Sequence, residues 1–548
     1  MTTMTGGEAV VAALEALGVD TVFGIVSIHN VPTLDAIGRS KSIEFIACRH
    51  EQGAVHAADG YARASGKLGV ALTSTGPGAA NAMGGLFEAN YASSPVLMIT
   101  GQVETTEFGR GRGTIHQAEQ QLTMMRTVTK RAEHIDSADE IVPVIMSVGL
   151  DMLSDRPGPG AIEIPIDQQY AKTEVADLRA EPPRRATPSK ALLDEARSLM
   201  ASAQRPLIIA GGGVGLANAA AELTKLAETL SAPVLTTVEG RGAIPETHPL
   251  ALGPNIDMSA MDPVLAQADV VIAVGTRFQQ NTNVLKWLRF NGKLIHLDAD
   301  PAMIGLVHPA EVSLVGDARL GLQALLAADI ASSSSPEWVA TCQARRDEVV
   351  ASNRNDIGPD IAAIMDAMSA ALPPDAVIAK DATISAYLWG NRLLPVHLPR
   401  TAIRPTSAAI GPGVPLGLGA AVATRKPTVV IQGDGGLMLS IGELATAAQY
   451  GLPLIVCVFN DRGYGMLRFI QDMAVSGRRT GVELATPDFE AVGSAFGINS
   501  ASISSVAQFV ETFTQAVAQG GPWILDIDLN AMSPMKITPQ PKPERSNT

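Results

Sequence analysis

The sequence has few cysteines, few aromatic residues and no excess of positive charge. Its 548 residues include three cysteines, Cys48, Cys342 and Cys457, and their scattered positions exclude a disulfide framework or a paired zinc motif. Aromatic residues make up 4% of the chain, and the formal net charge is −14. A net negative chain of this kind argues against a nucleic-acid-binding surface. We therefore expect buried cysteines and no nucleic-acid partner.

Signals for membranes and secretion are also missing. No uninterrupted apolar stretch reaches the roughly 20 residues that are needed to span a bilayer. The first ten residues, MTTMTGGEAV, lack a basic segment followed by an apolar one. These absences predict a cytoplasmic protein without a membrane partner.

Three blocks of alternating strand and helix patterns are separated by two irregular stretches. The first break, residues 171–190, is polar and rich in proline, and the second, residues 327–338, contains a run of serines. We predict domains at 1–170, 190–328 and 355–532, followed by a mobile tail at 533–548. Short apolar, β-branched runs alternate with amphipathic stretches, as in PLIIAG and TVVIQ. This pattern predicts three doubly wound α/β domains with parallel sheets.

Two aspartates in the third block follow two predicted neighbouring strands. One strand ends at Gln432, just before Asp434, and the next ends just before Asp461. Because a strand–helix–strand unit is parallel and right-handed, both aspartates should lie at the same carboxyl edge of the sheet, where such sheets bind ligands. Oxygen ligands beside glycines suit Mg²⁺ and phosphate groups. The alternative is that both aspartates are ordinary turn residues.

The helix between these two strands has a candidate start signal. Ser440 and Glu443 have the spacing of a capping box, in which each side chain bonds the other residue's backbone. We expect the helix to run from this point to about Tyr450.

A glutamate stands at the predicted start of a helix in the first block. The run SIEFIACRHEQGAVHAADGYARASG predicts a strand and then a helix that begins at about His50 and Glu51. On its own, Glu51 is adequately explained as a favourable partner for the helix dipole.

Taken together, these motifs resemble those of enzymes that depend on thiamine diphosphate (ThDP). The run GDGG, followed a helix and a strand later by FND, is similar to the ThDP motif that opens with GDG and usually closes with two asparagines. The run RHEQGA…ADGYAR is similar to the signature of acetolactate synthases and related 2-oxo acid decarboxylases. The resemblance covers nearly the whole chain. It implies a pyrimidine-binding, a central and a diphosphate-binding domain, and a cofactor whose ring carries the chemistry.

The resemblance also implies which residues contact the metal and the cofactor. The metal ligands would be Asp434, Asp461 and the backbone carbonyl of Gly463. Asp461 departs from the usual asparagine and adds negative charge beside the diphosphate. Ile410 would support the bent cofactor, unless it is a core residue, and the backbone near Ala408 would receive the pyrimidine amino group. The other implied cofactor contacts are Gly76, Pro77, Asn81, Thr383, Gly433, Gly435, Gly436 and Met466.

For Glu51, the resemblance implies a catalytic role. In the family, the matching glutamate donates a hydrogen bond to the pyrimidine ring, whose imino tautomer then removes the proton from the thiazolium carbon. A carboxyl group with this role must be protonated part of the time, so we expect an apolar pocket around Glu51 that raises its pKa. In the family, this glutamate and the metal site meet across a subunit interface, which implies a homodimer or homotetramer.

Three further polar residues match active-site positions of related enzymes. They are His29 in FGIVSIHN and the adjacent His116 and Gln117 in GRGTIHQAEQQ. The resemblance implies that they handle protons and substrate oxygens. For the two histidines, a purely structural role is the alternative. His56 and His134 show no such match, and we assign them no role.

The middle block carries a weaker signal. RPLIIAGGGVGLANAAAEL resembles a nucleotide-binding loop, but Leu216 occupies the last glycine position of the G-x-G-x-x-G pattern. A tight turn onto a helix is the simpler interpretation. Related proteins bind FAD or ADP in this domain or leave it empty, and FAD is not favoured here.

The resemblance defines the type of reaction better than the substrate. The overall likeness is to acetolactate synthase large subunits and to decarboxylases of basic 2-oxo acids. Ile470 stands where acetolactate synthases have a tryptophan that helps to select the acceptor. We predict decarboxylation of a 2-oxo acid, with or without carboligation to a second carbonyl compound. The alternatives are a lyase or hydrolase that cleaves a diketone or acyloin, a flavin-dependent oxidase and a non-catalytic ThDP-binding paralogue.

Overall fold

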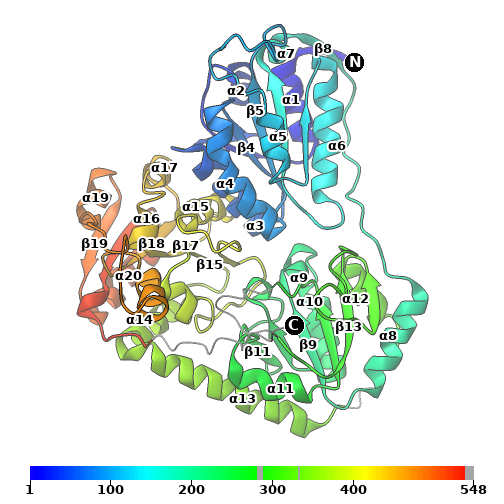
Figure 1. Cartoon of the computed structure of the whole chain (residues 1–548), viewed down its shortest axis with the longest axis vertical. Coiled ribbons are helices and arrows are strands. Elements are labelled where there is room, and N and C mark those ends of the chain that lie inside the picture. The colour runs from blue at the N-terminus through cyan, green and yellow to red at the C-terminus, as the bar shows by residue number, and fades with distance from the viewer. Residues whose placement is uncertain (280–287, 331–333, 537–548) are drawn as a thin grey trace.

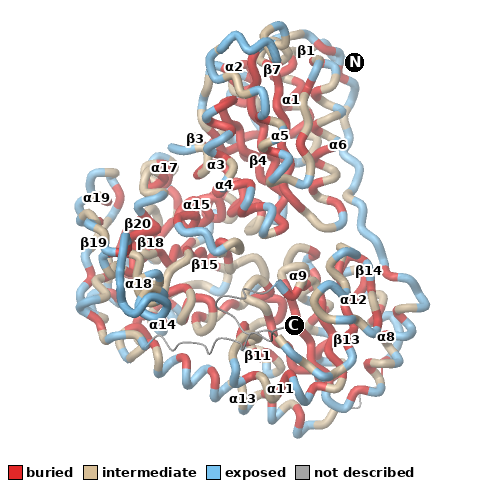
Figure 2. The backbone as a smooth tube through the Cα atoms, viewed as in Figure 1, coloured by how far each residue is buried: buried red, intermediate tan, exposed pale blue. Residues whose placement is uncertain are grey.

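Three six-stranded sheets, all with parallel pairing, organise the chain, as predicted (Figure 1). The computed structural model describes residues 1–279, 288–330 and 334–536. The strands are short, and the inner ones are largely buried because helices cover both faces of each sheet (Figure 2). Among the described helices, none is long and apolar enough to cross a membrane.

The first sheet has the order β3-β2-β4-β5-β7-β6. Its strands are β2 (Thr21–Gly24), β3 (Glu44–Ala47), β4 (Gly69–Thr73), β5 (Val96–Gln102), β6 (Arg131–His134) and β7 (Gly160–Pro165). The helices are α1 (Gly6–Ala16), α2 (Val31–Arg39), α3 (Glu51–Ser65), α4 (Pro77–Ala92), α5 (Gln121–Arg126), α6 (Ile141–Leu153) and α7 (Ile166–Tyr170). The helix predicted to begin at about His50 is α3, and the His50 side chain accepts a hydrogen bond from the N–H of Gln52 as its N-cap.

The central sheet has the order β11-β10-β9-β12-β13-β14. Its strands are β9 (Pro206–Ala210), β10 (Val234–Thr236), β11 (Ala251–Gly253), β12 (Val270–Val274), β13 (Lys293–Asp298) and β14 (Val312–Val315). The helices are α8 (Lys190–Ser202), α9 (Gly212–Leu216), α10 (Ala220–Leu230), α11 (Asp262–Gln267), α12 (Ala318–Leu326) and α13 (Pro336–Asp356).

The third sheet has the order β16-β15-β17-β18-β20-β19. Its strands are β15 (Val377–Lys380), β16 (Ala402–Ile403), β17 (Thr428–Gly433), β18 (Leu454–Asn460), β19 (Asn499–Ile503) and β20 (Trp523–Asp528). The helices are α14 (Gly358–Ala371), α15 (Gly413–Thr424), α16 (Asp434–Leu437), α17 (Glu443–Gln449), α18 (Gly465–Ala474), α19 (Phe489–Ala495) and α20 (Val506–Gln519). Helices α15 and α3 pack together, so the first and third domains share one apolar core.

The connections between the domains are more ordered than the sequence predicts. Residues 171–190 include β8 (Lys172–Val175), which pairs antiparallel with β1 (Thr2–Thr5). The second break ends earlier than predicted, because Ser335 caps α13 and the buried Trp338 packs on the central domain. Of the predicted tail, Ser533 and Lys536 donate backbone hydrogen bonds to Asp360 and Asp356. Residues 537–548 lie outside the described residues.

The capping box predicted at Ser440 is wrong. The chain turns through residues 438–442, and α17 begins only at Glu443. The Glu443 carboxylate accepts the N–H groups of Arg49 (3.0 Å) and His50 (3.1 Å), just before α3, instead of the N–H of Ser440. The Glu443 carboxylate, which the local spacing assigned to a helix cap, therefore makes a contact between two domains.

Candidate active site

Asp434 and Asp461 lie side by side at the carboxyl edge of the third sheet, as the strand pattern predicts. Strands β17 and β18 are parallel neighbours, with Gly433 opposite Phe459, and each aspartate follows the end of its strand. Asp434 is buried at 1% exposure. Neither of its carboxylate oxygens has a hydrogen-bond partner among the described residues. Buried polar oxygens almost always have a hydrogen-bond partner or a bound ion, so these two oxygens indicate a binding site.

The two carboxylates repel each other. Burial raises the pKa of Asp434, and the nearby backbone N–H groups of Asp461 and Gly463 only partly oppose this effect. Burial and then the negative charge of Asp434 raise the pKa of Asp461 to about 6, against the opposing charge of Arg468. A bound cation would remove this repulsion.

Gly463 stands on the same loop. Tyr464 donates its N–H to Val482 O at 2.9 Å, and Leu484 donates its N–H to Arg462 O at 3.2 Å. These bonds pair the loop with residues 482–484 and do not involve the carbonyl of Gly463.

The donor set suits Mg²⁺ bound together with phosphate oxygens. Within the described part of the chain, no group of three His, Cys, Asp or Glu side chains could hold a metal by itself. Two carboxylates and a backbone carbonyl leave coordination positions open, and Mg²⁺ commonly fills such positions with phosphate oxygens and water. The residues therefore fit Mg²⁺ and a diphosphate.

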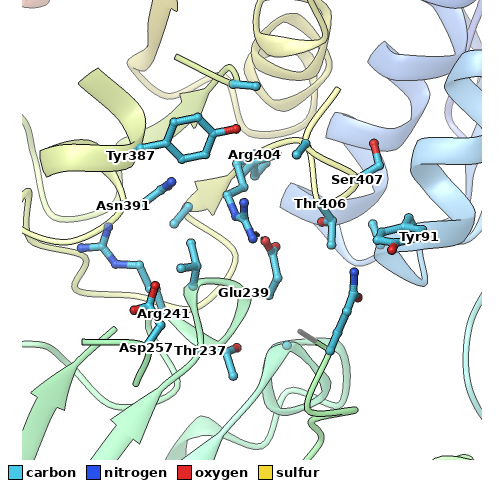
Figure 3. A pocket seen from close by; sticks show the side chains of 18 of the residues that line it. Tyr91, Thr237, Glu239, Arg241, Asp257, Tyr387, Asn391, Arg404, Thr406 and Ser407 are labelled. Atoms are coloured by element: carbon cyan, nitrogen blue, oxygen red, sulfur yellow. Dashed lines mark ion pairs between the residues drawn. The ribbon is translucent and has the colours of Figure 1, made fainter. Parts of the chain in front are cut away.

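A cavity of about 2540 Å³ where all three domains meet contains this edge. Figure 3 shows other side chains of its lining, among them Tyr91 of the first domain and Glu239 of the central domain. Its lining includes both aspartates and the following other positions predicted to contact the metal or cofactor: Thr383, Ala408, Ile410, Gly433, Gly435, Gly436, Gly463 and Met466. All of the third-domain positions predicted from the sequence are therefore brought together in one cavity.

Ala408 and Ile410 lie on a loop that projects into this cavity. Ala408 has a φ of +63°, a left-handed conformation that L-residues seldom adopt. Ile410 is 38% exposed, so it is not a core residue of this chain. The N–H of the next residue, Gly411, donates to both carboxylate oxygens of Asp381 at 2.9 Å, and burial raises the pKa of Asp381 to about 6. Sequence reasoning missed Asp381, although it follows β15 just as Asp434 follows β17.

The polar residues predicted in the first domain form a second group. Glu51 is partly exposed, and its Oε2 accepts a hydrogen bond from Asn81 Nδ2 at 3.1 Å. A side-chain carbon at Gly78 would lie 2.9 Å from Glu51 Oε1 and 2.8 Å from Ser74 Cβ, which places Ser74 close to the glutamate. This domain alone does not provide the enclosed pocket that the sequence predicts around Glu51.

His29 and His116 face each other next to Ser74. Their ring centroids are 5.4 Å apart, and His116 Nδ1 lies 3.5 Å from Ser74 Oγ. His29 is 6% exposed, and its Nδ1 has no partner among the described residues. Burial, and then the nearby His116, lowers the pKa of His29. An unsatisfied, neutral imidazole in this group is available to a ligand.

The loop that carries Gly76 and Pro77 is held by a glutamine that sequence reasoning missed. Gln121 accepts hydrogen bonds from the N–H of Gly76 (2.7 Å) and from Thr75 Oγ1 (2.9 Å). The side-chain amide of Gln117 is buried, and neither its oxygen nor its nitrogen has a hydrogen-bond partner within the described ranges. Nothing in the local pattern marked Gln121 as the residue that supports the loop.

The two groups do not share a cavity in one chain. All residues of the first-domain group are described, and the lining of the large cavity includes none of Glu51, His29, His116, Gln117, Gly76, Pro77 and Asn81. One chain thus presents two partial sites.

The glycine-rich loop of the central domain turns tightly onto a short helix. The N–H groups of Gly211 and Gly213 donate to Val274 O (2.9 Å) and Gly275 O (3.0 Å) on the neighbouring strand end. These two donors serve packing between strand ends, in line with the turn interpretation.

Comparison with known proteins identifies the family. Three thiamine pyrophosphate enzyme domains match the chain: the N-terminal TPP binding domain at residues 4–124, the central domain at 193–325 and the C-terminal TPP binding domain at 384–527.

Curated relatives match over almost the full length. A probable acetolactate synthase large subunit of Methanocaldococcus jannaschii is 33% identical over 98% of this chain and 94% of its own. A probable 2-ketoarginine decarboxylase of Pseudomonas aeruginosa is 35% identical over 90% of this chain and 89% of its own. The large subunit of acetolactate synthase isozyme 2 of Escherichia coli is 33% identical over 100% of this chain and 99% of its own. The chain belongs to the thiamine pyrophosphate enzymes.

Proposed function

We propose that this enzyme uses ThDP and Mg²⁺ to decarboxylate a 2-oxo acid, with or without addition of the product to a second carbonyl compound. The observation that carries the proposal is the buried carboxylate of Asp434, whose two oxygens have no hydrogen-bond partner among the described residues. It lines a cavity together with Asp461 and the third-domain positions expected to contact the cofactor. The relatives named acetolactate synthase and 2-ketoarginine decarboxylase support the reaction class.

In this proposal the third domain binds the diphosphate. Asp434, Asp461 and the carbonyl of Gly463 would hold Mg²⁺, whose charge would offset that of the diphosphate. When bound, ThDP supplies the electron sink for the carbon–carbon bond that breaks. Ile410 and the strained loop at Ala408 support the cofactor from one side of the cavity.

The first-domain group handles protons and substrate. Glu51 would hold a proton at its carboxyl group and could donate it to a bound cofactor. The neutral His29, with its unpartnered Nδ1, is placed to exchange a proton with the substrate, and His116 and Gln117 hold the substrate's oxygens. The unpartnered amide of Gln117 and the lowered pKa of His29 support these roles.

We further propose that two copies of the chain complete each site. The first-domain group of one copy would cover the cavity of the other copy. Exposed apolar side chains surround both partial sites and support this arrangement, because surfaces of this kind commonly mark interfaces. They are Val26, Ile28 and Ile115, which neighbour His29 and His116 in the sequence, and Leu467, Ile470 and Met473, which line the cavity.

The test is CO₂ release from a panel of 2-oxo acids, pyruvate and 2-ketoarginine included, with added ThDP and Mg²⁺. We expect release from at least one acid. Glu51→Gln should lower kcat about 100-fold or more, because proton transfer by a positioned group typically contributes at least that factor. The variant should still bind ThDP, since its third-domain contacts are intact.

Three outcomes would contradict the proposed reaction or mechanism. Near-normal turnover in Glu51→Gln with ThDP bound would refute the mechanism. No CO₂ from any acid, together with cleavage of a diketone or acyloin, would assign a lyase or hydrolase. ThDP binding without any turnover would indicate a non-catalytic protein. FAD is not part of the proposal, and flavin absorbance in the purified protein would contradict that choice.

A further inference from the structure

The loop of residues 404–411 lies where all three domains meet, and one carboxylate from each domain holds it. These carboxylates are Glu239 of the central domain, which pairs with Arg404 at 2.6 Å, Glu88 of the first domain, which binds Thr406 and Ser407, and Asp381 of the third domain, which binds Gly411. Figure 3 shows Arg404 and Glu239 facing each other, with Thr406 and Ser407 on the adjoining loop. Contacts from all three domains therefore hold this one loop.

Glu88 makes the closest set of contacts. Its side chain is fully buried on α4. It accepts the N–H of Thr406 at 2.6 Å, the N–H of Ser407 at 3.0 Å and the hydroxyl of Ser407. Hydrogen bonds to an ionised acceptor are the strong ones, and two of these three come from the backbone, so they fix the path of the chain.

Arg63 of α3 keeps Glu88 ionised. Its Nη2 lies 2.7 Å from Glu88 Oε1, and it makes a bidentate pair with the buried Asp59 at 2.6 and 2.8 Å. Burial alone would raise the pKa of Glu88, but the charge of Arg63 and the hydrogen bonds from Ser407 outweigh burial and lower it. Arg63 Nη1 also donates to the carbonyl of Arg404 at 2.6 Å.

The contacts of Glu88 and Arg63 with residues 404–407 form a clamp on the loop. The residues just beyond this clamp are strained and exposed. Ala408 has a φ of +63°, and residues 408–410 are exposed and include the cavity-lining Ala408 and Ile410. A strained backbone of this kind persists only where the surroundings over-determine it. Here Glu88 holds the chain two residues before Ala408, and Asp381 holds it three residues after.

We propose that Glu88, backed by Arg63, is a positioning residue that holds Ala408 in its left-handed conformation and so keeps the loop ready for the cofactor. The inference rests on the proposed function, because that function makes Ala408 a cofactor contact. Without the clamp, Ala408 relaxes to a negative φ, only a fraction of the molecules remains competent, and the apparent Kd for ThDP rises by the inverse of that fraction.

The test compares Glu88→Gln, Ala408→Gly and the double variant. In the absence of ThDP, Glu88→Gln should speed hydrogen exchange at the amides of Thr406 and Ser407. It should raise the Kd for ThDP about tenfold, equivalent to about 1.4 kcal/mol. Ala408→Gly in the same chain should restore the Kd to within about twofold, because glycine adopts a positive φ without strain.

Glu8→Gln is the matched control, since Glu8 also accepts a backbone N–H and pairs with an arginine in the same domain. It should leave the Kd for ThDP unchanged. If Glu88→Gln does not fold, Ser407→Ala can replace it. This variant removes one hydrogen bond to Glu88 and should also raise the Kd for ThDP. An unchanged Kd in Glu88→Gln, or no rescue by Ala408→Gly, would overturn the inference.

Failure of the proposed function would give a different result from failure of this inference. In that case the wild-type protein itself would not bind ThDP, whatever the variants do. Hydrogen exchange at Thr406 and Ser407 in the ThDP-free protein would still decide whether Glu88 holds the loop.

Discussion

His56 illustrates how a single buried residue ties stability to pH. It is 2% exposed within α3, and its Nδ1 has no hydrogen-bond partner among the described residues. Burial lowers the pKa of His56 to about 4, although the charge of Glu88 opposes this effect. The pKa in the folded state thus lies below that in the unfolded chain, which takes up a proton first as the pH falls. Stability is therefore lost as the pH falls from about 6.5 towards 4.

We predict that His56→Gln flattens this pH dependence. Between pH 7.5 and pH 5 the wild-type protein should lose about 2 kcal/mol more of its free energy of unfolding than the variant. Urea denaturation midpoints at several pH values in this range measure the difference. Parallel profiles for the two proteins would show that His56 does not titrate in this way.

At the scale of residues, the sequence predicted where side chains lie better than it predicted which groups they bind. Asp434 and Asp461 lie together because strand order alone brings them to one edge. Glu88 and Gln121 could not be predicted, because their hydrogen bonds join segments that are distant in the sequence. The sequence pattern does not define how Asp461, which stands in place of the usual asparagine, affects the affinity for the metal.

At the scale of elements, the contact of α3 with α15 depends on glycine. A side-chain carbon at Gly419 would lie 1.8 Å from the carbonyl oxygen of Ala57, which belongs to the backbone and cannot turn aside. We predict that Gly419→Ala destabilises the protein by roughly 1–3 kcal/mol, the usual cost of overpacking.

Gly38 of α2 provides the matched control for this substitution. It also lies within a helix, but a side-chain carbon there meets no atom within 4 Å. Gly38→Ala should stabilise the protein by roughly 0.5–1 kcal/mol, because alanine suits a helix better than glycine does. Thermal unfolding of both variants measures the contrast, and equal shifts would refute the packing argument.

Local periodicity predicted most of the strands and helices, and it failed where tertiary contacts prevailed. The helix expected at Ser440 begins at Glu443 because the Glu443 carboxylate binds the backbone before α3. Strand β8 was not predicted because it exists only through its pairing with β1. Both contacts join segments that are more than 150 residues apart.

At the scale of the whole molecule, the arrangement of the domains separates the two groups of predicted site residues within one chain. The sequence placed each group of residues within its own domain, but spacing says nothing about whether one chain brings Glu51 to the cavity of Asp434. The structure shows that residues of all three domains line the cavity of a single chain, Arg63 and Tyr91 of the first domain included, but that Glu51 does not. The central claim is therefore that one chain supplies Glu51 and another supplies Asp434.

The most direct test is complementation between two inactive variants. Chains carrying Glu51→Gln and Asp434→Asn would be co-expressed with different affinity tags, and the mixed dimer would be isolated by both tags. Such a dimer has one site with both changes and one site with neither change. CO₂ release from the preferred 2-oxo acid should therefore return to about half of the wild-type rate per dimer, while each variant alone stays inactive. A mixed dimer as inactive as its parents would contradict the account, because it would place Glu51 and Asp434 in the same chain's site.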